Sequence, residues 1–531
     1  MALCTFEVLL PYQTHTAITV THRMEVAIPT NEPAIHRLVD DILEYIFLLN
    51  ATPPFWSPPV TESTWKDQQP TVEHATTLAS SQVCMRWRSI AFNCHTIWGL
   101  IINYHRHSLR WIETLLDRSN PSSLDFGGRF RNIYLVDRGQ GVLELVFNHI
   151  DRLRIFNAHL PSSSWELVCS RFLHLPAPNL EIMFVFFDDF AGRLTHPLFD
   201  NHAPNLRNFC LSMWTVDFTS PVFSPLTELI LDVSQVNGLF TILDWLNILG
   251  GMPSLRSVQL NGLDQAISRG SPNDIFPFIH LNALDMLMVD GPFHECVALV
   301  KHLILPPRCG LSLRCEDAHV GSDQRQLWAI IEKRIGSWAK NVPYRRLNAK
   351  AGAGSVDIGN IPREDDGRDL DPIMSISLYS SNFEETIPLF HSLFALFERT
   401  FFTTTILRLW INHDTARAEA FTSSSLFDHF RGFANLEKLI VGNDCLPRLL
   451  FPFLQSANPV LFPTLKSLYF YNVKFRDGSD SILRLADFIQ WRRERGLPVQ
   501  KINIGRNSHW IDREYVLSHI QDTVVEMDDE S

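Results

Sequence analysis

The chain has 531 residues and a mass of 60.9 kDa, with 45% hydrophobic and 20% charged residues. This composition is typical of a globular protein with a large buried core and more than one structural unit. The formal net charge of −12 and the pI near 5.9 argue against nucleic-acid binding, because recognition of a phosphate backbone needs a basic face and no run rich in lysine and arginine is present.

Cysteine usage and hydropathy indicate the compartment. The nine cysteines are spread thinly from Cys4 to Cys445, unlike the dense disulfide framework of a small secreted protein. The opening residues lack the basic start and sustained apolar core of a signal peptide. No run reaches the roughly 18 apolar residues that a membrane span needs. We therefore expect a cytoplasmic or nuclear protein that does not enter a membrane.

Residues 1–33 have no clear periodicity and are left unassigned, and a helical module is predicted for residues 34–100. The first helix has apolar residues at positions i, i+4, i+5, i+8 and i+11, which form one helical face: Leu38, Ile42, Leu43, Ile46 and Leu49. Residues 51–70 contain five prolines and are predicted to be a loop or insertion.

A second helix is predicted from about residue 73 to residue 83. A third begins at Val83, and its spacing places Trp87, Ile90 and Ala91 on the same face. Arg86 and Arg88 flank Trp87 and are expected to direct their charge to solvent or to a partner.

A different pattern repeats over residues 101–515. Its skeleton is an apolar residue, two of any kind, an apolar residue, one of any kind and an apolar residue, as in NLEIMFV, NLRNFCL, PLTELIL, SLRSVQL, NLEKLIV and TLKSLYF. The first apolar positions are Leu180, Leu206, Leu226, Leu255, Leu281, Leu436 and Leu465. Their steps are 26, 20, 29 and 26 in the first group and 29 in the second, in or near the period of leucine-rich repeats.

Amphipathic helical segments lie between these strand segments, at residues 239–249, 389–397 and 482–489. A strand and helix of this length cannot bury their apolar faces alone, whereas stacked units can. The predicted fold class is α/β, with an N-terminal three-helix module followed by an irregular leucine-rich-repeat solenoid whose strands line one side. The alternative is an ordinary α/β domain with scattered leucine-rich strands.

Two segments are expected to lack regular structure. Residues 347–372 are rich in glycine and acidic residues and poor in apolar ones, which predicts a flexible loop between repeats. Residues 516–531 are expected to form a frayed acidic tail.

No motif for chemistry emerges from the sequence. There is no Cys-x-x-Cys pair, and Cys309 and Cys315 are six apart inside a predicted strand. His105 and His107 form a lone His-x-His pair, and residues 351–359 have the glycines of a phosphate loop without its Gly-Lys-Ser/Thr ending. The adjacent carboxylates Asp188 and Asp189 are interpreted as solvated. We predict no catalytic residue, no metal site and no cofactor.

The helical module resembles an F-box, the module that tethers a protein to the adaptor of SCF-type ubiquitin ligases. The first part of the resemblance is carried by Leu38, Val39, Asp40, Asp41, Ile42, Leu43, Ile46 and Phe47, and the second by Val83, Cys84, Arg86, Trp87, Arg88 and Trp98. The residue pattern is similar to that of F-box proteins of mushroom-forming (basidiomycete) fungi, in which an irregular leucine-rich region usually follows. Val39 stands where the family has proline, and the loop between the first two helices is longer than usual.

The resemblance implies a non-enzymatic receptor that docks on the adaptor and presents a protein substrate. A module of this size cannot hide all of its apolar residues, which independently favours a partner; the alternative, which we favour for Trp98 and Ile101, is packing on the first repeats of the same chain. The expected adaptor-binding residues are Leu38, Val39, Ile42, Leu43, Ile46, Phe47, Val83, Trp87 and Ile90. Outward positions of the strands are expected to bind substrate, namely Asn208, Ser212, Gln259, Asn261, Lys438, Tyr469 and Tyr471.

Two alternatives remain at this stage. The runner-up is an F-box-derived scaffold that acts through its repeats without ligase association, and Val39 is the residue that favours it. An enzyme with a site assembled from distant residues is the third.

Overall fold

The computed structural model describes most of the chain outside its first 37 residues. The described residues are 38–51, 72–104, 107–129, 136–233, 240–263, 276–318, 325–342, 345–352, 354–360, 374–380, 383–397, 403–411, 429–442, 445–471, 480–504 and 524–527. The predictions for residues 1–33 and for the proline-rich insertion 51–70 fall outside this part, except for Ala51.

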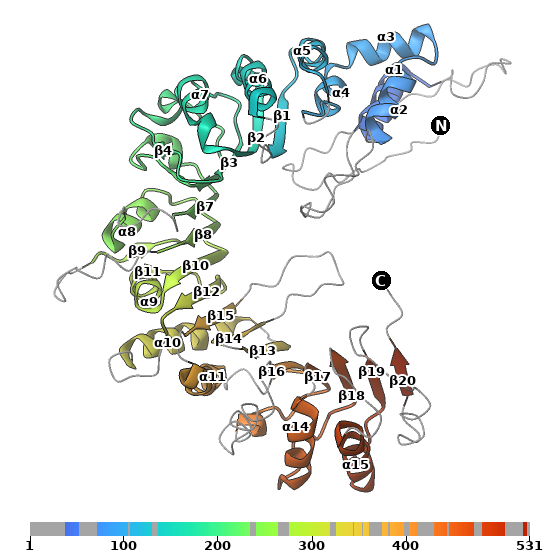
Figure 1. Cartoon of the computed structure of the whole chain (residues 1–531), viewed down its shortest axis with the longest axis vertical. Helices are drawn as coiled ribbons and strands as arrows, with labels where there is room; N and C mark the ends of the chain where they lie inside the picture. Colours follow the sequence, from blue (N-terminus) through green and yellow to red (C-terminus); the bar gives the residue numbers. More distant parts are fainter. Residues whose placement is uncertain are drawn as a thin grey trace, which may run out of the picture. The chain divides into compact units, whose positions relative to one another are not determined.

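The chain forms two compact units (Figure 1). Unit 1 comprises residues 1–102 and 114–122, and unit 2 comprises residues 103–113 and 123–531. The helices of unit 1 are α1 (Asp40–Ala51), α2 (Val72–Ser80), α3 (Met85–Asn93) and α4 (His95–Leu100), and α5 (Leu109–Arg118) has residues in both units. The three predicted helices of the N-terminal module are thus present as α1, α2 and α3.

Unit 2 is built on a single large sheet. In the order in which they lie side by side, its strands are β1 (Leu124–Arg129), β2 (Leu153–Leu160), β3 (Ile182–Phe187), β5 (Asn208–Ser212), β7 (Glu228–Asp232), β8 (Ser257–Asn261), β10 (Met286–Pro292), β12 (Gly310–Glu316), β15 (Met374–Tyr379), β14 (Ser355–Asn360), β13 (Arg346–Gly352), β16 (Ile406–Ile411), β17 (Lys438–Gly442), β18 (Ser467–Tyr471), β19 (Lys501–Ile504) and β20 (Val524–Met527). Two small parallel pairs add β4 (Gly192–Arg193) with β6 (Trp214–Thr215), and β9 (Ile279–His280) with β11 (Leu303–Ile304).

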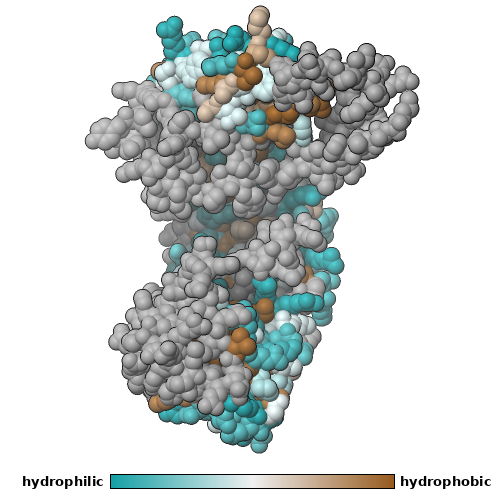
Figure 2. All heavy atoms as spheres, turned by 90° about the vertical axis from the view of Figure 1, so that its right-hand side faces the viewer, coloured by the Kyte–Doolittle hydropathy of each residue, from teal (hydrophilic) through white to brown (hydrophobic). Residues whose placement is uncertain are grey.

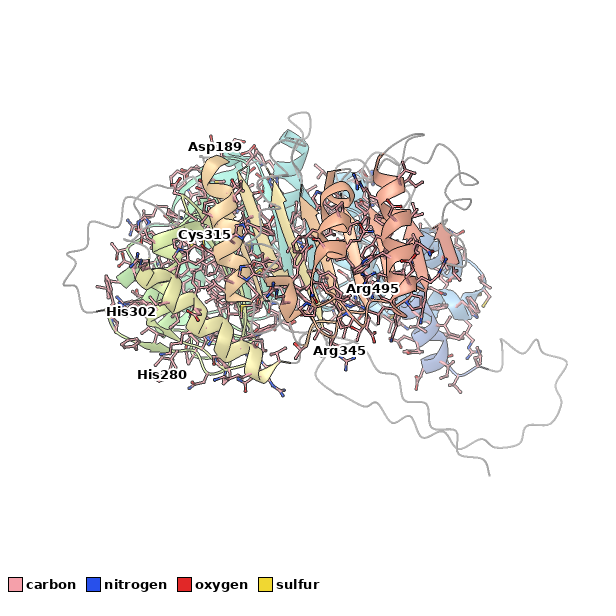
Figure 3. All side chains as sticks on the ribbon, turned by 90° about the horizontal axis from the view of Figure 1, so that it is seen from below. Asp189, His280, His302, Cys315, Arg345 and Arg495 are labelled. Atoms are coloured by element: carbon pink, nitrogen blue, oxygen red, sulfur yellow. The ribbon has the colours of Figure 1, made fainter. Side chains whose placement is uncertain are left out.

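The described helices of unit 2 lie on one face of this sheet, and none of them lies on the other face (Figure 1); in the view from below they lie in front of the strands (Figure 3). They are α6 (Val136–Phe147), α7 (Trp165–Val168), α8 (Ile242–Gly250), α9 (Phe293–His302), α10 (Arg325–Asn341), α11 (Phe383–Leu396), α14 (Cys445–Ser456) and α15 (Asp480–Glu494). We call the face without helices the open face. The result is a mixed α/β architecture with a large, mainly parallel sheet that does not close into a barrel.

A recurring turn places a leucine two residues before several strands of the sheet. The backbone N–H of Leu206 donates to the carbonyl of Ala203, and Leu255 and Leu465 make the same bond to the residue three positions earlier. These leucines are at most 2% exposed, so each is part of the buried core just before its strand begins. Leu284, not Leu281, is the equivalent residue before β10, because Met286 pairs with Ser257 of β8.

The glycine-rich and acidic segment is only partly what its composition predicts. β13 (Arg346–Gly352) and β14 (Ser355–Asn360) pair as an antiparallel hairpin, which inserts into the sheet between β15 and β16. Gly354 sits in the turn with φ of 77°, a conformation that side chains with a Cβ rarely adopt. The flexible loop predicted for 347–372 is therefore wrong as far as Asn360, and residues 361–373 lie outside the described part.

The expectation of a frayed tail over residues 516–531 is corrected for residues 524–527 alone, and the rest of that tail lies outside the described residues. Residues 524–527 form β20, which pairs in parallel with β19. Separately, none of the helices in the described part of the chain is both long enough and apolar enough to cross a membrane.

Candidate functional site

The candidate chemical residues of the sequence are structural. Cys309 and Cys315 are at most 1% exposed. Burial raises the pKa of Cys309 to about 11, and a hydrogen bond with Cys315 is the main cause that raises the pKa of Cys296. A protonated thiol is a poor metal ligand and nucleophile. Within the described ranges no cluster of three or more His, Cys, Asp or Glu residues is arranged to hold a metal ion.

The other chemical candidates are similarly accounted for. The carboxylates of Asp188 and Asp189 accept hydrogen bonds from the backbone N–H groups of Ser162 and Phe190. The glycines at 351–359 belong to the β13–β14 hairpin. His105 lies outside the described residues. Among the described residues these positions give no support to a catalytic centre.

The small core of unit 1 contains three of the residues that the sequence analysis predicts to bind a partner. Leu43 and Phe47 of α1 are at most 1% exposed, and Ile90 of α3 is 8% exposed. Phe47 meets Trp87 edge-on, with ring centroids 5.3 Å apart. Because side chains this buried do not reach a partner, we assign Leu43, Phe47 and Ile90 to the core and correct their prediction as docking residues.

An arginine joins the starts of α1 and α3. The Nε and Nη2 atoms of Arg86 donate to the Asp40 carboxylate at 2.9 and 2.6 Å, and Nη2 also donates to the carbonyl of Leu38. Arg88 donates to the carbonyl of Ser81 at 3.2 Å. Arg88 is exposed and Arg86 is partly exposed, in agreement with the expectation that both direct their charge outward, and these hydrogen bonds add a structural role. This partly exposed ion pair contributes on the order of 1 kcal/mol or less.

Cys84 explains why α3 begins where it does. Its sulfur accepts a hydrogen bond from the backbone N–H of Trp87 at 3.5 Å, which caps the first turn. Trp98, the last residue of the F-box-like pattern, donates from its indole N–H to the carbonyl of Ala91 at 2.8 Å. The guanidinium of Arg118 lies 4.9 Å from its ring. Cys84 and Trp98 thus stabilise unit 1 itself.

The same unit leaves apolar side chains uncovered. Val39 is 41% exposed, Val83 59% and Met85 85%, and Figure 2 shows brown apolar side chains on the helices of unit 1, at the top of the view. Arg86 holds Leu38 and Asp40 at the start of α3. Val39, Val83 and Met85 therefore flank the place where the starts of α1 and α3 meet. We call Val39, Val83 and Met85 the apolar end of unit 1.

Further apolar side chains extend this surface along α1. Tyr45 is 41% exposed and Leu49 55% exposed, and the predicted residues Leu38, Ile42 and Ile46 are half-buried. Sequence reasoning missed Met85 and Tyr45. Met85 directly follows the Val83–Cys84 pair in the sequence, but its spacing gave no sign that its side chain is exposed. The structure shows this exposure.

The predicted substrate residues all lie on the open face but form two groups. Asn208 and Ser212 of β5 and Gln259 and Asn261 of β8 are separated by β7 alone. The amide of Asn208 donates to Glu228, and the hydroxyl of Ser212 donates to Asp232 at 3.2 Å. Ser212 is only 4% exposed, so its prediction as a substrate contact is corrected to a support for Asp232.

The second group surrounds a pair of aromatic rings. Tyr471 of β18 lies 5.3 Å from Trp410 of β16, centroid to centroid, and the guanidinium of Arg408 lies 5.9 Å from the Tyr471 ring. The ammonium of Lys438 lies 5.2 Å from the Tyr469 ring. We call Arg408, Trp410, Lys438, Tyr469 and Tyr471 the cationic–aromatic patch. Sequence reasoning missed Arg408 and Trp410.

A glycine makes the ring contact possible. Gly442 of β17 pairs with Trp410 on one side and Tyr471 on the other, so it lies between them in the sheet. A Cβ at this position would come within 2.6 Å of Cε3 of Trp410. The missing side chain therefore lets the two aromatic residues meet across β17.

Charge is divided along the open face. Acidic residues, together with Arg314, lie on β7 to β12: Glu228, Asp232, Asp290 and Glu316. Burial raises the pKa of Asp290, whereas Arg314, 3.5 Å away, opposes this rise. On β13 and β16 to β19 the described charged side chains of this face are all cationic, namely Arg346, Lys350, Arg408, Lys438 and Lys501. We call the β7 to β12 part the acidic half of the open face and the β16 to β19 part its cationic half, and Asp357 of β14, which pairs with Lys350 of β13, lies between them.

Comparisons with known proteins add no relative. No protein-family model matches the chain, and a search of curated proteins finds no match.

Proposed function

We propose that the chain is a substrate-recognition subunit of an SCF-type cullin–RING ubiquitin ligase. In this proposal unit 1 is an F-box that binds the adaptor, and unit 2 is a leucine-rich-repeat solenoid that binds a protein substrate. No cofactor is needed, because the transfer chemistry belongs to other subunits.

The apolar end of unit 1 is the observation that carries the proposal. Leu43, Phe47 and Ile90 already fill the core, yet Val39, Val83 and Met85 remain 41–85% exposed. Leaving three such side chains in water at one helix joint forgoes burial that a partner would supply, at roughly 25 cal/mol per Å². These residues flank or belong to the F-box-like pattern, so the adaptor is the partner that we propose.

The regularity of unit 2 supports the repeat part of the proposal. The turn before each strand recurs, and its backbone hydrogen bonds pass from strand to strand: Arg207 receives bonds from Thr227 and Glu228, and Thr227 receives bonds from Arg256 and Ser257. Such neighbour-to-neighbour stacking is typical of solenoid repeats. An open strand face opposite the helices is also the surface that such proteins use for binding.

Charge placed on the apolar end is expected to abolish adaptor binding. For the full-length Val83→Asp/Met85→Asp variant we expect retention on immobilised fungal adaptor to fall by about tenfold or more, since aspartate cannot be desolvated in an apolar contact. Both side chains are exposed, so thermal unfolding is expected to be unchanged. The matched control is Leu243→Asp, a 42%-exposed leucine of α8, which should bind like the parent. Equal retention of the parent and the double variant, or no retention of the parent, would contradict the ligase proposal and favour a repeat scaffold.

Proline at position 39 is expected to strengthen the same interaction. The carbonyl of Val39 accepts the first bonds of α1, from Ile42 and Leu43 at 3.1 and 3.2 Å, so this residue sets the start of the helix. Proline there restricts the unfolded chain and stabilises the turn by up to ~1 kcal/mol. We expect Val39→Pro to raise adaptor affinity, measured by titration calorimetry. A loss of affinity with unchanged folding would show that valine is the better contact.

A further inference from the structure

In the cationic half of the open face, two cationic residues have the spacing of alternate residues in an extended peptide. Arg408 on β16 and Lys438 on β17 lie on neighbouring strands, with Lys438 level with Ile406, two residues before Arg408. Because neighbouring strands lie ~4.8 Å apart and rise ~3.3 Å per residue, the Cα atoms of such diagonal positions are ~8 Å apart. Alternate side chains of an extended peptide point the same way and are separated by ~7 Å. Two carboxylates at alternate positions of one extended segment therefore match the two cations.

The patch also has a hydrogen-bond donor without an acceptor and a flat aromatic surface. The Nε of Arg408 is buried and donates no hydrogen bond within the described part of the chain, which is a cost in the free chain. Trp410 and Tyr471 lie beside it and meet over Gly442. Flat aromatic surfaces of this kind take proline or aliphatic side chains of an extended peptide.

We propose that the cationic–aromatic patch binds an acidic, extended segment of the substrate protein. Carboxylates at alternate positions pair with Arg408 and Lys438, and the intervening side chains pack on Trp410 and Tyr471. This inference rests on the proposed function insofar as unit 2 is the part that receives a substrate, and it names the chemistry that the substrate must carry.

Nucleic acid is disfavoured as the ligand by the rest of the molecule. Aromatic rings with arginine and lysine also bind single strands, but the chain has a net charge of −12. The acidic half of the same face, with Asp232 and Asp290, would repel a phosphate backbone that extended along the sheet. A short acidic peptide needs only the patch.

Binding of defined peptides to the full-length chain tests the inference. The probe is a fluorescein-labelled peptide of alternating glutamate and proline, compared with glutamine–proline and lysine–proline peptides and with a labelled single-stranded oligodeoxynucleotide. We expect anisotropy to show binding of the glutamate peptide alone, with affinity that falls as sodium chloride rises. Arg408→Glu/Lys438→Glu should weaken it by about tenfold or more.

The control is Lys333→Glu/Lys340→Glu, which reverses two exposed charges of α10 and changes the net charge equally. It should bind like the parent, and both variants should unfold at the parental temperature. No binding of the glutamate peptide, equal binding of the glutamine peptide, equal loss in the control, or tighter binding of the oligonucleotide would overturn the inference. Adaptor retention, measured separately, distinguishes its failure from failure of the ligase proposal, because the patch and the apolar end are in different units.

Discussion

Replacement of Arg492 by methionine is expected to destabilise unit 2 by ~2–4 kcal/mol. Arg492 of α15 is 1% exposed. Its guanidinium donates to the carbonyls of Leu497 at 3.0 Å, Leu461 at 3.3 Å, and Phe462 at 3.0 Å. Methionine fills a similar volume but leaves those buried carbonyls without this donor, which costs more than an exposed hydrogen bond would.

The position of these acceptors gives the variant a second expected effect. Phe462 and Leu465 form the recurring turn that leads into β18, the strand of Tyr469 and Tyr471. Losing Arg492 therefore loosens the turn on which the cationic–aromatic patch depends. Burial lowers the pKa of Arg492 to about 10, which still leaves the group charged at neutral pH.

Urea unfolding followed by circular dichroism measures the effect. We expect the unfolding midpoint of Arg492→Met to fall, and Arg492→Lys to recover only part of the loss, because lysine lacks the planar fork of donors. The neighbouring Arg493→Met is the matched control, since the Arg493 side chain donates to Gln490 in an exposed position and should cost less than ~0.5 kcal/mol. Equal midpoints for the two methionine variants would show that the buried guanidinium is not stabilising.

Much of the fold was predictable because it is encoded locally. The leucines before β5, β7 and β8 recur in the sequence, and each is buried where its strand begins. The leucine skeleton did not detect β16, the strand of Trp410, because Thr404 occupies the position before it that leucine holds before other strands. Thr404 is nevertheless as buried as those leucines, at 0% exposed. A skeleton that requires leucine cannot detect a buried threonine, but the alternation of Leu407 and Leu409 was a usable signal.

Pairings between distant residues were not predictable from one sequence. Arg86 and Asp40 are 46 residues apart, and nothing in local spacing shows that they meet. The composition of β13 and β14 predicts a loop because glycine and acidic residues are rare in strands. Its insertion between β15 and β16 supplies partners on both sides, and these tertiary hydrogen bonds outweigh the weak local propensity.

Replacement of Phe47 by alanine is expected to unfold unit 1 while unit 2 stays folded. Removing a buried phenylalanine costs ~3–5 kcal/mol, and a unit this small has little more stability than that. Phe47 is 1% exposed and supports Trp87 in the core, so α1 and α3 should lose their common packing and adaptor retention should disappear. Hydrogen exchange measured by mass spectrometry should show lost protection in α1 and α3 and parental protection in β16 to β18. Tyr45→Ala, on the same helix but 41% exposed, should keep both units protected. Loss of protection in β16 to β18 as well would mean that the two units unfold together.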